Sequence, residues 1–368
     1  MSPEAEPAEA RVPELPSLKM RLVEHIVMDG PISVADYVHL CLHDRQDGYY
    51  SRHVALGPDG DFLTAPLISQ MFGEMIGVWV AQVWHDLGSP ARFDLVEIGG
   101  GDGTLMSDIL RVAGHVPGLG DAAMITFVEP GGLGARQAAA VPGARLVTSL
   151  RQLESELPAI YLANEVLDCL PANQFVITDD GWHERRIGVR DNELIFGLVP
   201  VAADFVPPHD APVGEIVEIS FEQISLARHL ALRLRTTTGA ALLIDYGRDT
   251  PGTGDTLQAL SRHEKRDPLE APGRHDLTQW ADFPAIAAAA RQGGVRVSTI
   301  TPQSTFLHRL GIDTRLLALT TKNPDYAAVL ERQYQRLVAP DQMGDLFKVL
   351  GLAWPDTLDF PGLDAPAS

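Results

Sequence analysis

Apolar residues recur at helical spacing near the beginning of the chain. Over residues 18–28, and again over 34–42, they follow the 3.6-residue period of an amphipathic helix, and Ser33 stands where the second helix would be capped. Gly48-Tyr49-Tyr50 follows this second run. The pattern predicts an N-terminal helical cap, and we expect residues 18–90 to form this cap together with a lid.

The middle of the chain alternates short apolar runs with segments that are compatible with helices. The run at 93–98 leads into glycines and precedes a helical pattern in which Leu105, Ile109 and Val112 share one face. Similar short runs lie at residues 124–128, 146–148, 160–163 and 240–244. Buried strands separated by helices are typical of a parallel sheet with crossovers, so the sequence predicts an α/β core over residues 91–352.

The pattern changes between residues 174 and 199 to two or three alternating strands with turn signals, followed by a Pro-rich loop. We interpret about 174–217 as a β insertion. Ser220 stands three residues before Gln223, which predicts a capping box at the start of a helix. We further expect a strand at 295–300, a disordered leader at 1–17 and a tail at 353–368.

The composition narrows the kind of partner. The 368 residues include 29 Lys and Arg against 49 Asp and Glu, a formal net charge of −20, and no basic run is visible. Such a chain repels nucleic-acid phosphates, so no nucleic-acid partner is expected, and a small molecule or a basic protein segment is the more natural one. No apolar stretch approaches the ~20 residues of a spanning helix, so we expect no membrane insertion.

Cysteine and histidine content adds little chemistry. Cys41 and Cys169 are too few for a disulfide framework, as in a reducing cytoplasm, and the leader lacks the Arg-rich pattern of an import signal. We therefore expect a bacterial, cytoplasmic protein. His263 and His275 have no partners at ligand spacing, so no metal site is predicted. The oligomeric state is left open.

The segment Glu97-Ile98-Gly99-Gly100-Gly101-Asp102-Gly103 follows the first predicted core strand. Glycines at such a turn let the backbone approach a ligand, and the next helix presents free N–H groups. Gly99, Gly101 and Gly103 alternate, and no frame gives the dinucleotide spacing G-x-G-x-x-G. The alternation favours S-adenosylmethionine, whose zwitterionic and sulfonium charges suit the acids Glu97 and Asp102. Thr104, which opens the helix, is a further candidate for binding this cofactor.

Glu129 ends the second predicted strand of the core. An acid at this place in such folds accepts hydrogen bonds from the two ribose hydroxyls of a bound nucleoside, and we predict that role for Glu129. The alternatives are that the glycines form a plain flexible loop and that Glu129 is a solvated strand end.

Several short segments beyond the loop occur in an order that is specific to one family. They are Gly60-Asp61-Phe62-Leu63-Thr64, Phe72-Gly73-Glu74, Asn164-Glu165-Val166-Leu167-Asp168, Asp245-Tyr246-Gly247, the run from Gly273 to Phe283, Thr305-Phe306-Leu307 and the run from Met343 to Lys348. On these residues the chain resembles the MidA-like family of S-adenosylmethionine-dependent methyltransferases, from about residue 18 to 352. That family includes the mitochondrial complex I assembly factor, which methylates an arginine of a complex I subunit.

The resemblance implies a class I, Rossmann-like methyltransferase fold and a protein substrate, with a complex I subunit as one candidate. Some positions depart from the family pattern: Gly100 and Asp102 replace its usual proline and arginine, and the segment after Glu129 reads Pro130-Gly131-Gly132. We expect cofactor binding to survive these changes, whereas the identity of the substrate does not carry over.

Candidate catalytic acids follow the strand at 160–163. An arginine guanidinium stays cationic at working pH, so carboxylates are needed to hold it in a bidentate fork. Asn164 and Glu165 stand where this strand leaves the sheet, and Asp168 follows one helical turn later. We predict Glu165 and Asp168 as catalytic and Asn164 as cofactor-binding. The alternative is that both acids merely complement a helix N-terminus.

Other polar segments are weaker candidates. Asp61 and Thr64 are predicted to fold back over the cofactor as part of the lid, although a plain loop-to-helix junction is equally compatible. Glu184, on the predicted insertion, and Asp245 with Tyr246, at a strand end, are candidates for shaping the acceptor pocket.

Two other functions remain open at this point. One is a methyltransferase that acts on a small molecule or on nucleic acid, and the other is a cofactor-binding assembly chaperone without catalysis. Intact Glu97, Glu129 and Glu165 argue against the chaperone.

Overall fold

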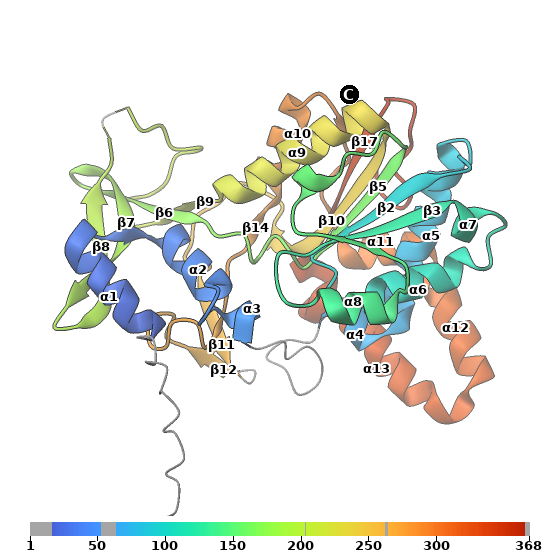
Figure 1. Ribbon diagram of the computed structural model, residues 1–368, viewed down its shortest axis with the longest axis horizontal. Coiled ribbons are helices and arrows are strands. Elements are labelled where there is room, and N and C mark those ends of the chain that lie inside the picture. The colour runs from blue at the N-terminus through green and yellow to red at the C-terminus, as the bar shows by residue number, and fades with distance from the viewer. Residues whose placement is uncertain (1–16, 53–63, 203, 262–263, 365–368) are drawn as a thin grey trace, which may run out of the picture.

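The computed structural model describes residues 17–52, 64–202, 204–261 and 264–364 (Figure 1). Its larger part is built on one sheet in the order β15-β17-β10-β5-β2-β3-β4, with β14 beside β10 and β16 beside β17. The strands are β2 (Phe93–Ile98), β3 (Ala123–Val128), β4 (Arg145–Val147), β5 (Ala159–Asn164), β10 (Gly239–Arg248), β14 (Ala281–Asp282), β15 (Arg296–Val297), β16 (Thr301–Pro302) and β17 (Phe347–Trp354). The strands from β10 to β4 are parallel, which confirms the predicted α/β class.

Alternate residues of each central strand face two separate apolar cores. In β5, Ile160 and Leu162 pack into one core, whereas Tyr161 and Ala163 pack into the other. Every residue from Ala159 to Ala163 is therefore buried, which explains why the strand reads as a continuous apolar run.

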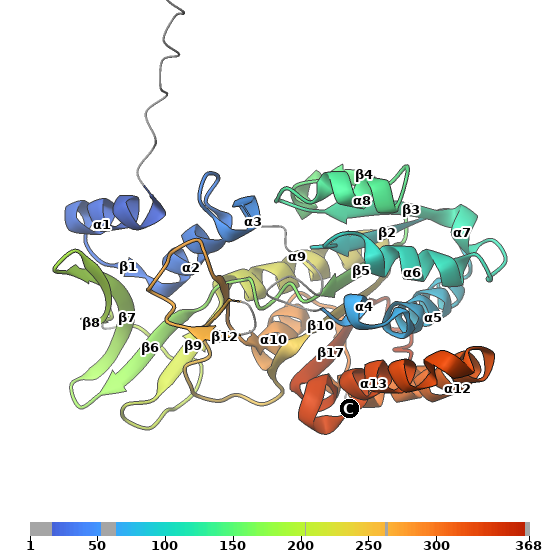
Figure 2. The ribbon, with the colours of Figure 1, turned by 90° about the horizontal axis from the view of Figure 1, so that it is seen from below.

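Helices cover both faces of this sheet. The first core holds α4 (Ala65–Ile68), α5 (Gln70–Asp86), α6 (Thr104–Ala113), α7 (Leu119–Ala122), α11 (Gln303–Leu310), α12 (Ile312–Lys322) and α13 (Ala327–Val338). The second core holds α9 (Phe221–Thr237) and α10 (Phe283–Gln292), and the short α8 (Gly134–Ala140) lies beside β4 in Figure 2. Among the described helices, none combines the length and the apolar character needed to cross a bilayer.

The N-terminal helices and the β insertion form one unit beside the core, on the left of Figure 1. Its elements are α1 (Leu18–Asp29), β1 (Ile32–Ser33), α2 (Val34–His43), α3 (Tyr49–Arg52), β6 (Asn173–Thr178), β7 (Gly181–Arg190), β8 (Glu193–Pro200) and β9 (Ile216–Ile219). Strand β1 pairs with β7, and Leu22 and Val38 of the helices share an apolar cluster with Ile187 of the insertion. A three-stranded sheet of β11 (Gln258–Ser261), β12 (Glu264–Arg266) and β13 (Asp276–Thr278) adjoins this unit.

Most of the elements predicted from the pattern are present within a few residues of their expected bounds. Only half of the expected capping box is present: the Ser220 hydroxyl accepts a hydrogen bond from the Gln223 N–H at 3.1 Å, but the Gln223 side chain donates to the Leu167 carbonyl and accepts from the Asp282 N–H instead of bonding back to Ser220. The single strand expected over 295–300 is wrong: the chain leaves the sheet between β15 and β16, where Ser298 exchanges hydrogen bonds with the Gly351 backbone.

The C-terminal segment closes the core rather than trailing from it. Strand β17 runs antiparallel to β10 and ends at Trp354, so the division expected at residue 352 falls inside this strand. Beyond it, Leu358, Phe360 and Leu363 are buried in the first core. The leader expected over 1–17 lies almost entirely outside the described residues.

Close packing of α5 against α6 yields a test of the fold. A Cβ placed on Gly73 would lie 2.5 Å from the Asp108 Cβ, and one on Gly77 would lie 2.9 Å from the Val112 Cβ. We expect Gly73→Ala to lower the free energy of unfolding by about 1–3 kcal/mol, because overpacking outweighs the gain in helix propensity. Urea denaturation measures the change.

The matched control is Gly188→Ala in β7, where an added Cβ meets no atom within 4 Å. It is expected to change the unfolding midpoint little. Unfolding of Gly73→Ala at the wild-type urea concentration, or above it, would contradict the packing argument.

Candidate active site

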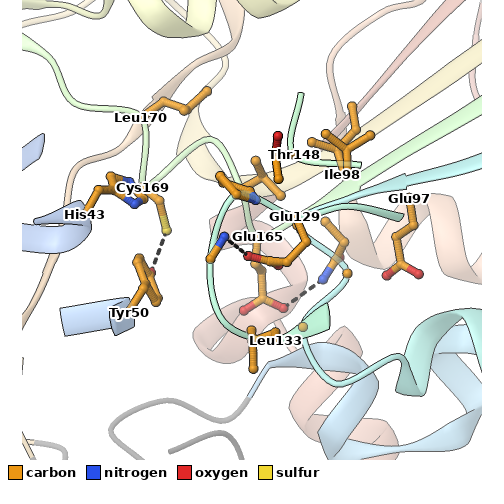
Figure 3. Close-up of a pocket in the computed structure, with 18 of the residues that line it drawn as sticks. His43, Tyr50, Glu97, Ile98, Glu129, Leu133, Thr148, Glu165, Cys169 and Leu170 are labelled. Carbon is orange, nitrogen blue, oxygen red and sulfur yellow. Dashed lines mark hydrogen bonds between the residues drawn. The ribbon is translucent and has the colours of Figure 1, made fainter. Parts of the chain in front are cut away.

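The site lies at the edge of the sheet where the parallel strands end. The carboxyl ends of β2, β3 and β5 open into a cavity of about 720 Å³ (Figure 3). Its lining includes the sequence-predicted residues Thr64, Glu97, Gly99, Asp102, Thr104, Glu129, Asn164, Glu165 and Asp168. Residues that are distant in the sequence thus meet in one place, as the carboxyl-edge rule for open α/β sheets requires.

The glycine loop joins β2 to α6 in a conformation that requires glycine. Gly99, Gly101 and Gly103 have φ values of 65°, 51° and 87°, in the left-handed region that side chains disfavour. A Cβ on Gly99 would lie 2.6 Å from the Val166 side chain. The loop therefore passes close to its neighbours and presents backbone to the cavity.

Asp102, in the loop, and Thr104, the first residue of α6, are joined by a hydrogen bond. Asp102 Oδ1 accepts a hydrogen bond from the Thr104 N–H at 3.0 Å. Helix α6 has Gly103 as its N-cap, without a side-chain capping bond, so Asp102 satisfies one N–H of the first turn. Both Asp102 and Thr104 line the cavity.

Glu97 is a buried acid that lacks a cation partner among the described residues. Its side chain is 3% exposed, and its Oε2 has no hydrogen-bond partner in the described part of the chain. Burial, with a smaller effect of Asp102, raises the pKa of Glu97 to about 8. A buried, unpaired carboxyl beside a glycine cradle fits a ligand that brings positive charge, such as the ammonium and sulfonium groups of S-adenosylmethionine.

Glu129, at the end of β3, is held by two donors. Its Oε1 accepts from the Gly131 N–H at 2.7 Å, and its Oε2 accepts from Gln137 Nε2 at 3.3 Å. Burial raises the pKa of Glu129, and these hydrogen bonds oppose the rise. Glu129 lines the cavity and is partly exposed, so its carboxyl is accessible to a ligand there.

Gln137, which the sequence analysis missed, joins Glu129 to the glycine loop. This fully buried side chain on α8 also donates to the Gly101 carbonyl at 3.1 Å. The available signal was an uncharged polar residue, next to Arg136, within the short helix Gly-Ala-Arg-Gln-Ala-Ala-Ala.

Glu165 stands at a sharp turn where β5 leaves the sheet. Its φ is 53°, and its Oε1 accepts from Asn164 Nδ2 at 3.1 Å and from the Ala65 N–H at 2.8 Å. Burial raises the pKa of Glu165 to about 7, while the Ala65 bond opposes the rise and the charge of Asp168 adds to it. The carboxyl thus links the end of β5 to the start of α4.

Asp168 lies on the same turn but not on a helix. The helix considered after Glu165 is absent, because Asp245 Oδ2 accepts the N–H groups of Leu167 and Asp168 at 2.8 and 3.2 Å and folds the chain into a turn. Asp168 Oδ2 accepts from the Tyr246 hydroxyl at 2.7 Å. Asp245 and Tyr246 therefore act from behind Asp168 and are not among the cavity-lining residues.

The remaining candidates fall in different places. Asp61 lies outside the described residues. Thr64 lines the cavity and precedes α4 without a side-chain capping bond. Glu184 is paired with Arg186 at 2.6 Å and lies in a second, smaller cavity with α9 and the insertion. Within the described part of the chain, no three His, Cys, Asp or Glu side chains are grouped so as to hold a metal ion.

The far end of the cavity is lined by residues of the cap and α9 that sequence reasoning did not assign to the site. They are His39, His43, Arg45, Tyr49, Tyr50, Glu222, Ser225 and His229. The signal available in the sequence was Gly48-Tyr49-Tyr50, two adjacent aromatics after a helix that carries two histidines.

A parallel sheet with an antiparallel β17, a glycine loop after β2 and an acid at the end of β3 define a Rossmann-like S-adenosylmethionine-dependent methyltransferase. Residues 75–301 match the family described as "Putative S-adenosyl-L-methionine-dependent methyltransferase". The chain belongs to this family, as its resemblance to MidA-like proteins led us to expect.

Curated relatives and solved structures agree with this assignment. The chain is 35% identical to the mitochondrial protein arginine methyltransferase NDUFAF7 of Rattus norvegicus, and the match covers 94% of this chain and 86% of the rat protein. It is 34% identical to the Homo sapiens protein of the same name, over 94% of this chain and 85% of the human protein. A Burkholderia thailandensis protein bound to S-adenosyl-homocysteine superposes with a TM-score of 0.79 at 27% identity, covering 93% of this chain and 92% of that one.

The buried Glu97 makes the stability of the fold depend on pH. Its pKa is about 8 in the folded protein against an ordinary value of 4.5, so between these pH values the folded chain retains a proton that the unfolded chain releases. The stability that this proton provides is fully present below pH 4.5 and is lost as the pH rises through 8. Glu97→Gln, which is neutral throughout, should therefore exceed the wild type in stability by roughly 1–3 kcal/mol at alkaline pH.

Urea denaturation of both proteins at mildly acidic and alkaline pH checks this difference. Near pH 5, where Glu97 is protonated in the fold, the two proteins are expected to unfold almost together. The exposed Glu24→Gln is the control for removing one carboxylate. If the difference in stability between Glu97→Gln and the wild type does not change with pH, the raised pKa of Glu97 is refuted.

Proposed function

We propose that this methyltransferase acts on an arginine side chain of a protein substrate. The observation that carries the proposal is that Glu165 and Asp168 lie on one turn of the chain and line the same cavity as the glycine loop. The names of the mitochondrial relatives, protein arginine methyltransferase, support the same acceptor.

At the cofactor end, we assign binding of S-adenosylmethionine to the residues predicted from the sequence. They are Glu97, Gly99, Gly101, Asp102, Gly103, Thr104, Glu129 and Asn164, with Thr64 at the rim. When bound, the cofactor supplies an electrophilic methyl group on its sulfonium. Glu97 offsets the positive charge of the ligand, the glycine backbone lies against it, and Glu129 accepts the ribose hydroxyls.

At the acceptor end, the carboxyls of Glu165 and Asp168 hold and orient the guanidinium. The pKa of Glu165, which burial raises to about 7, falls when a cation arrives, so binding of the acceptor favours the charged carboxylate. Asp168 is already oriented by the Tyr246 hydroxyl and by the Cys169 thiol, which donates at 3.2 Å. The fixed carboxylates align one nitrogen with the methyl group for an in-line transfer in which the S–CH3 bond breaks as the N–CH3 bond forms, and the Glu165 carboxylate accepts the proton that this nitrogen loses.

For the partner, we propose a protein with a basic segment around the target arginine, because the chain carries a net charge of −20. A complex I subunit is the specific candidate that the resemblance suggests. Incubation with labelled S-adenosylmethionine and a cell lysate distinguishes the alternatives: label on one protein band supports the proposal, label in small metabolites supports a small-molecule enzyme, and binding without label supports a chaperone.

Removal of the Glu165 charge tests the acceptor assignment. Glu165→Gln keeps the size of the side chain but not the carboxylate, so it should retain cofactor affinity while methyl transfer to the labelled protein falls about 100-fold or more. Calorimetry and a single-turnover transfer assay measure the two quantities. Glu184→Gln, in the separate cavity, is the control and should transfer normally. If Glu165→Gln transfers methyl groups as fast as the wild type, Glu165 does not hold the acceptor.

Removal of Glu129 tests the cofactor end. Glu129→Ala eliminates two charge-assisted hydrogen bonds to the ribose, and we expect the dissociation constant for S-adenosyl-homocysteine to rise about 10- to 100-fold. Calorimetric titration measures it, with the exposed Glu154→Ala as control. Equal affinity in Glu129→Ala and wild type would remove the ribose role.

A further inference from the structure

The acceptor end of the cavity is closed by two aromatic rings from the N-terminal cap. His43, the last residue of α2, and Tyr50, in α3, line the same cavity as Glu165 and Asp168 although they precede these acids by more than a hundred residues. In Figure 3 they lie on the left with Cys169, whereas Glu97 lies on the right. The cap thus contributes a wall that the methyltransferase core lacks.

The Tyr50 ring is held in place by its hydroxyl. This hydroxyl lies 2.8 Å from Cys169 Sγ and 3.4 Å from Asp276 Oδ1, and its one hydrogen can be donated to either atom. Cys169 in turn donates to Asp168 Oδ1 at 3.2 Å. The ring is therefore joined through one thiol to an acid that we assign to the acceptor, and its orientation follows from that connection.

The His43 ring continues the wall beside Tyr50. The two ring centroids are 5.6 Å apart with an interplanar angle of 31°, and His39 lies 5.2 Å beyond His43. Burial, with the neighbouring His39, lowers the pKa of His43 to about 4, so the imidazole is neutral at physiological pH. The neutral ring therefore adds no positive charge to that of Arg45, which also lines this end of the cavity.

A planar cation is the ligand that this combination suits. The faces of aromatic rings attract a guanidinium by cation–π interaction and stacking, while carboxylates accept its N–H groups in the plane of the fork. Rings and carboxylates are both present at this end of the cavity, so a guanidinium can meet its flat face and its edge at once.

We propose that His43 and Tyr50 form the acceptor-recognition wall, against which the guanidinium lies flat while Glu165 and Asp168 hold its nitrogens. This inference rests on the proposed arginine acceptor and adds to it the residues that select a planar cation. It also gives Gly48-Tyr49-Tyr50, which the cofactor chemistry leaves unexplained, a place in substrate binding.

The test uses two synthetic probes and requires no knowledge of the natural substrate. Each probe is an S-adenosyl-homocysteine analogue with a short tether, which ends in a guanidinium in one and in a neutral urea of the same shape in the other. The affinity ratio of the two probes measures guanidinium recognition, and S-adenosyl-homocysteine alone reports the integrity of the cofactor end. Calorimetry gives all three dissociation constants.

For the wild type, we expect the guanidinium probe to bind at least about tenfold more tightly than the urea probe. Tyr50→Leu, which removes the ring, and His43→Lys, which adds a cation, should reduce this ratio to about threefold or less with unchanged affinity for S-adenosyl-homocysteine. Tyr50→Phe keeps the ring but loses the hydroxyl that orients it, so its ratio should lie between those of the wild type and Tyr50→Leu. His25→Lys adds the same charge on the outer face of α1 and should keep all of it.

The outcomes separate the two proposals. A wild-type ratio near one overturns the arginine acceptor and this inference together. A wild-type preference that survives in both Tyr50→Leu and His43→Lys overturns the aromatic wall alone and leaves the arginine acceptor in place. His43→Leu, which removes the second ring without adding charge, decides the question if His43→Lys fails to fold.

Discussion

The structure is organised around carboxyl groups that are withdrawn from water at one edge of a parallel sheet. Strands β2, β3 and β5 carry Glu97, Glu129 and Glu165 at or just beyond this edge, where all three acids line the cavity, and Asp245 lies behind them inside β10. Burial raises the pKa of every one of these groups. Negative charges that are gathered at one place repel one another, so the arrangement favours a positively charged ligand. The backbone N–H, side-chain amide and hydroxyl groups around the acids donate hydrogen bonds that orient them.

How much of this could be predicted depended on whether a signal is local in the sequence. Apolar runs and the glycine loop carry their structure in adjacent residues, so the parallel strands and the position of the cofactor end followed directly. Strand β17 was not predicted, because its place in the sheet depends on antiparallel pairing with β10, which lies far earlier in the chain. The turn at Asp168 also escaped, since it is folded by Asp245, 77 residues away. Tyr50 was missed for the same reason, as its partner Cys169 is 119 residues distant.

The two parts of the molecule have separate apolar cores. The methyltransferase sheet buries its own apolar faces, while the cap and insertion share a third cluster of which Leu22, Val38 and Ile187 are members. The end of the cavity that we propose for the acceptor is lined by residues of both parts, with the cap on one side and the end of β5 on the other. The geometry of this end therefore depends on how firmly the two parts are joined.

The pairing of β1 with β7 ties the first helices of the chain to an insertion that begins more than a hundred residues later. The wall that we propose for the acceptor therefore belongs to a part of the molecule whose sheet is separate from the one that carries the glycine loop and Glu129. On that proposal, substitutions in the cap and insertion can change which acceptor is methylated while the residues around the methyl donor stay the same.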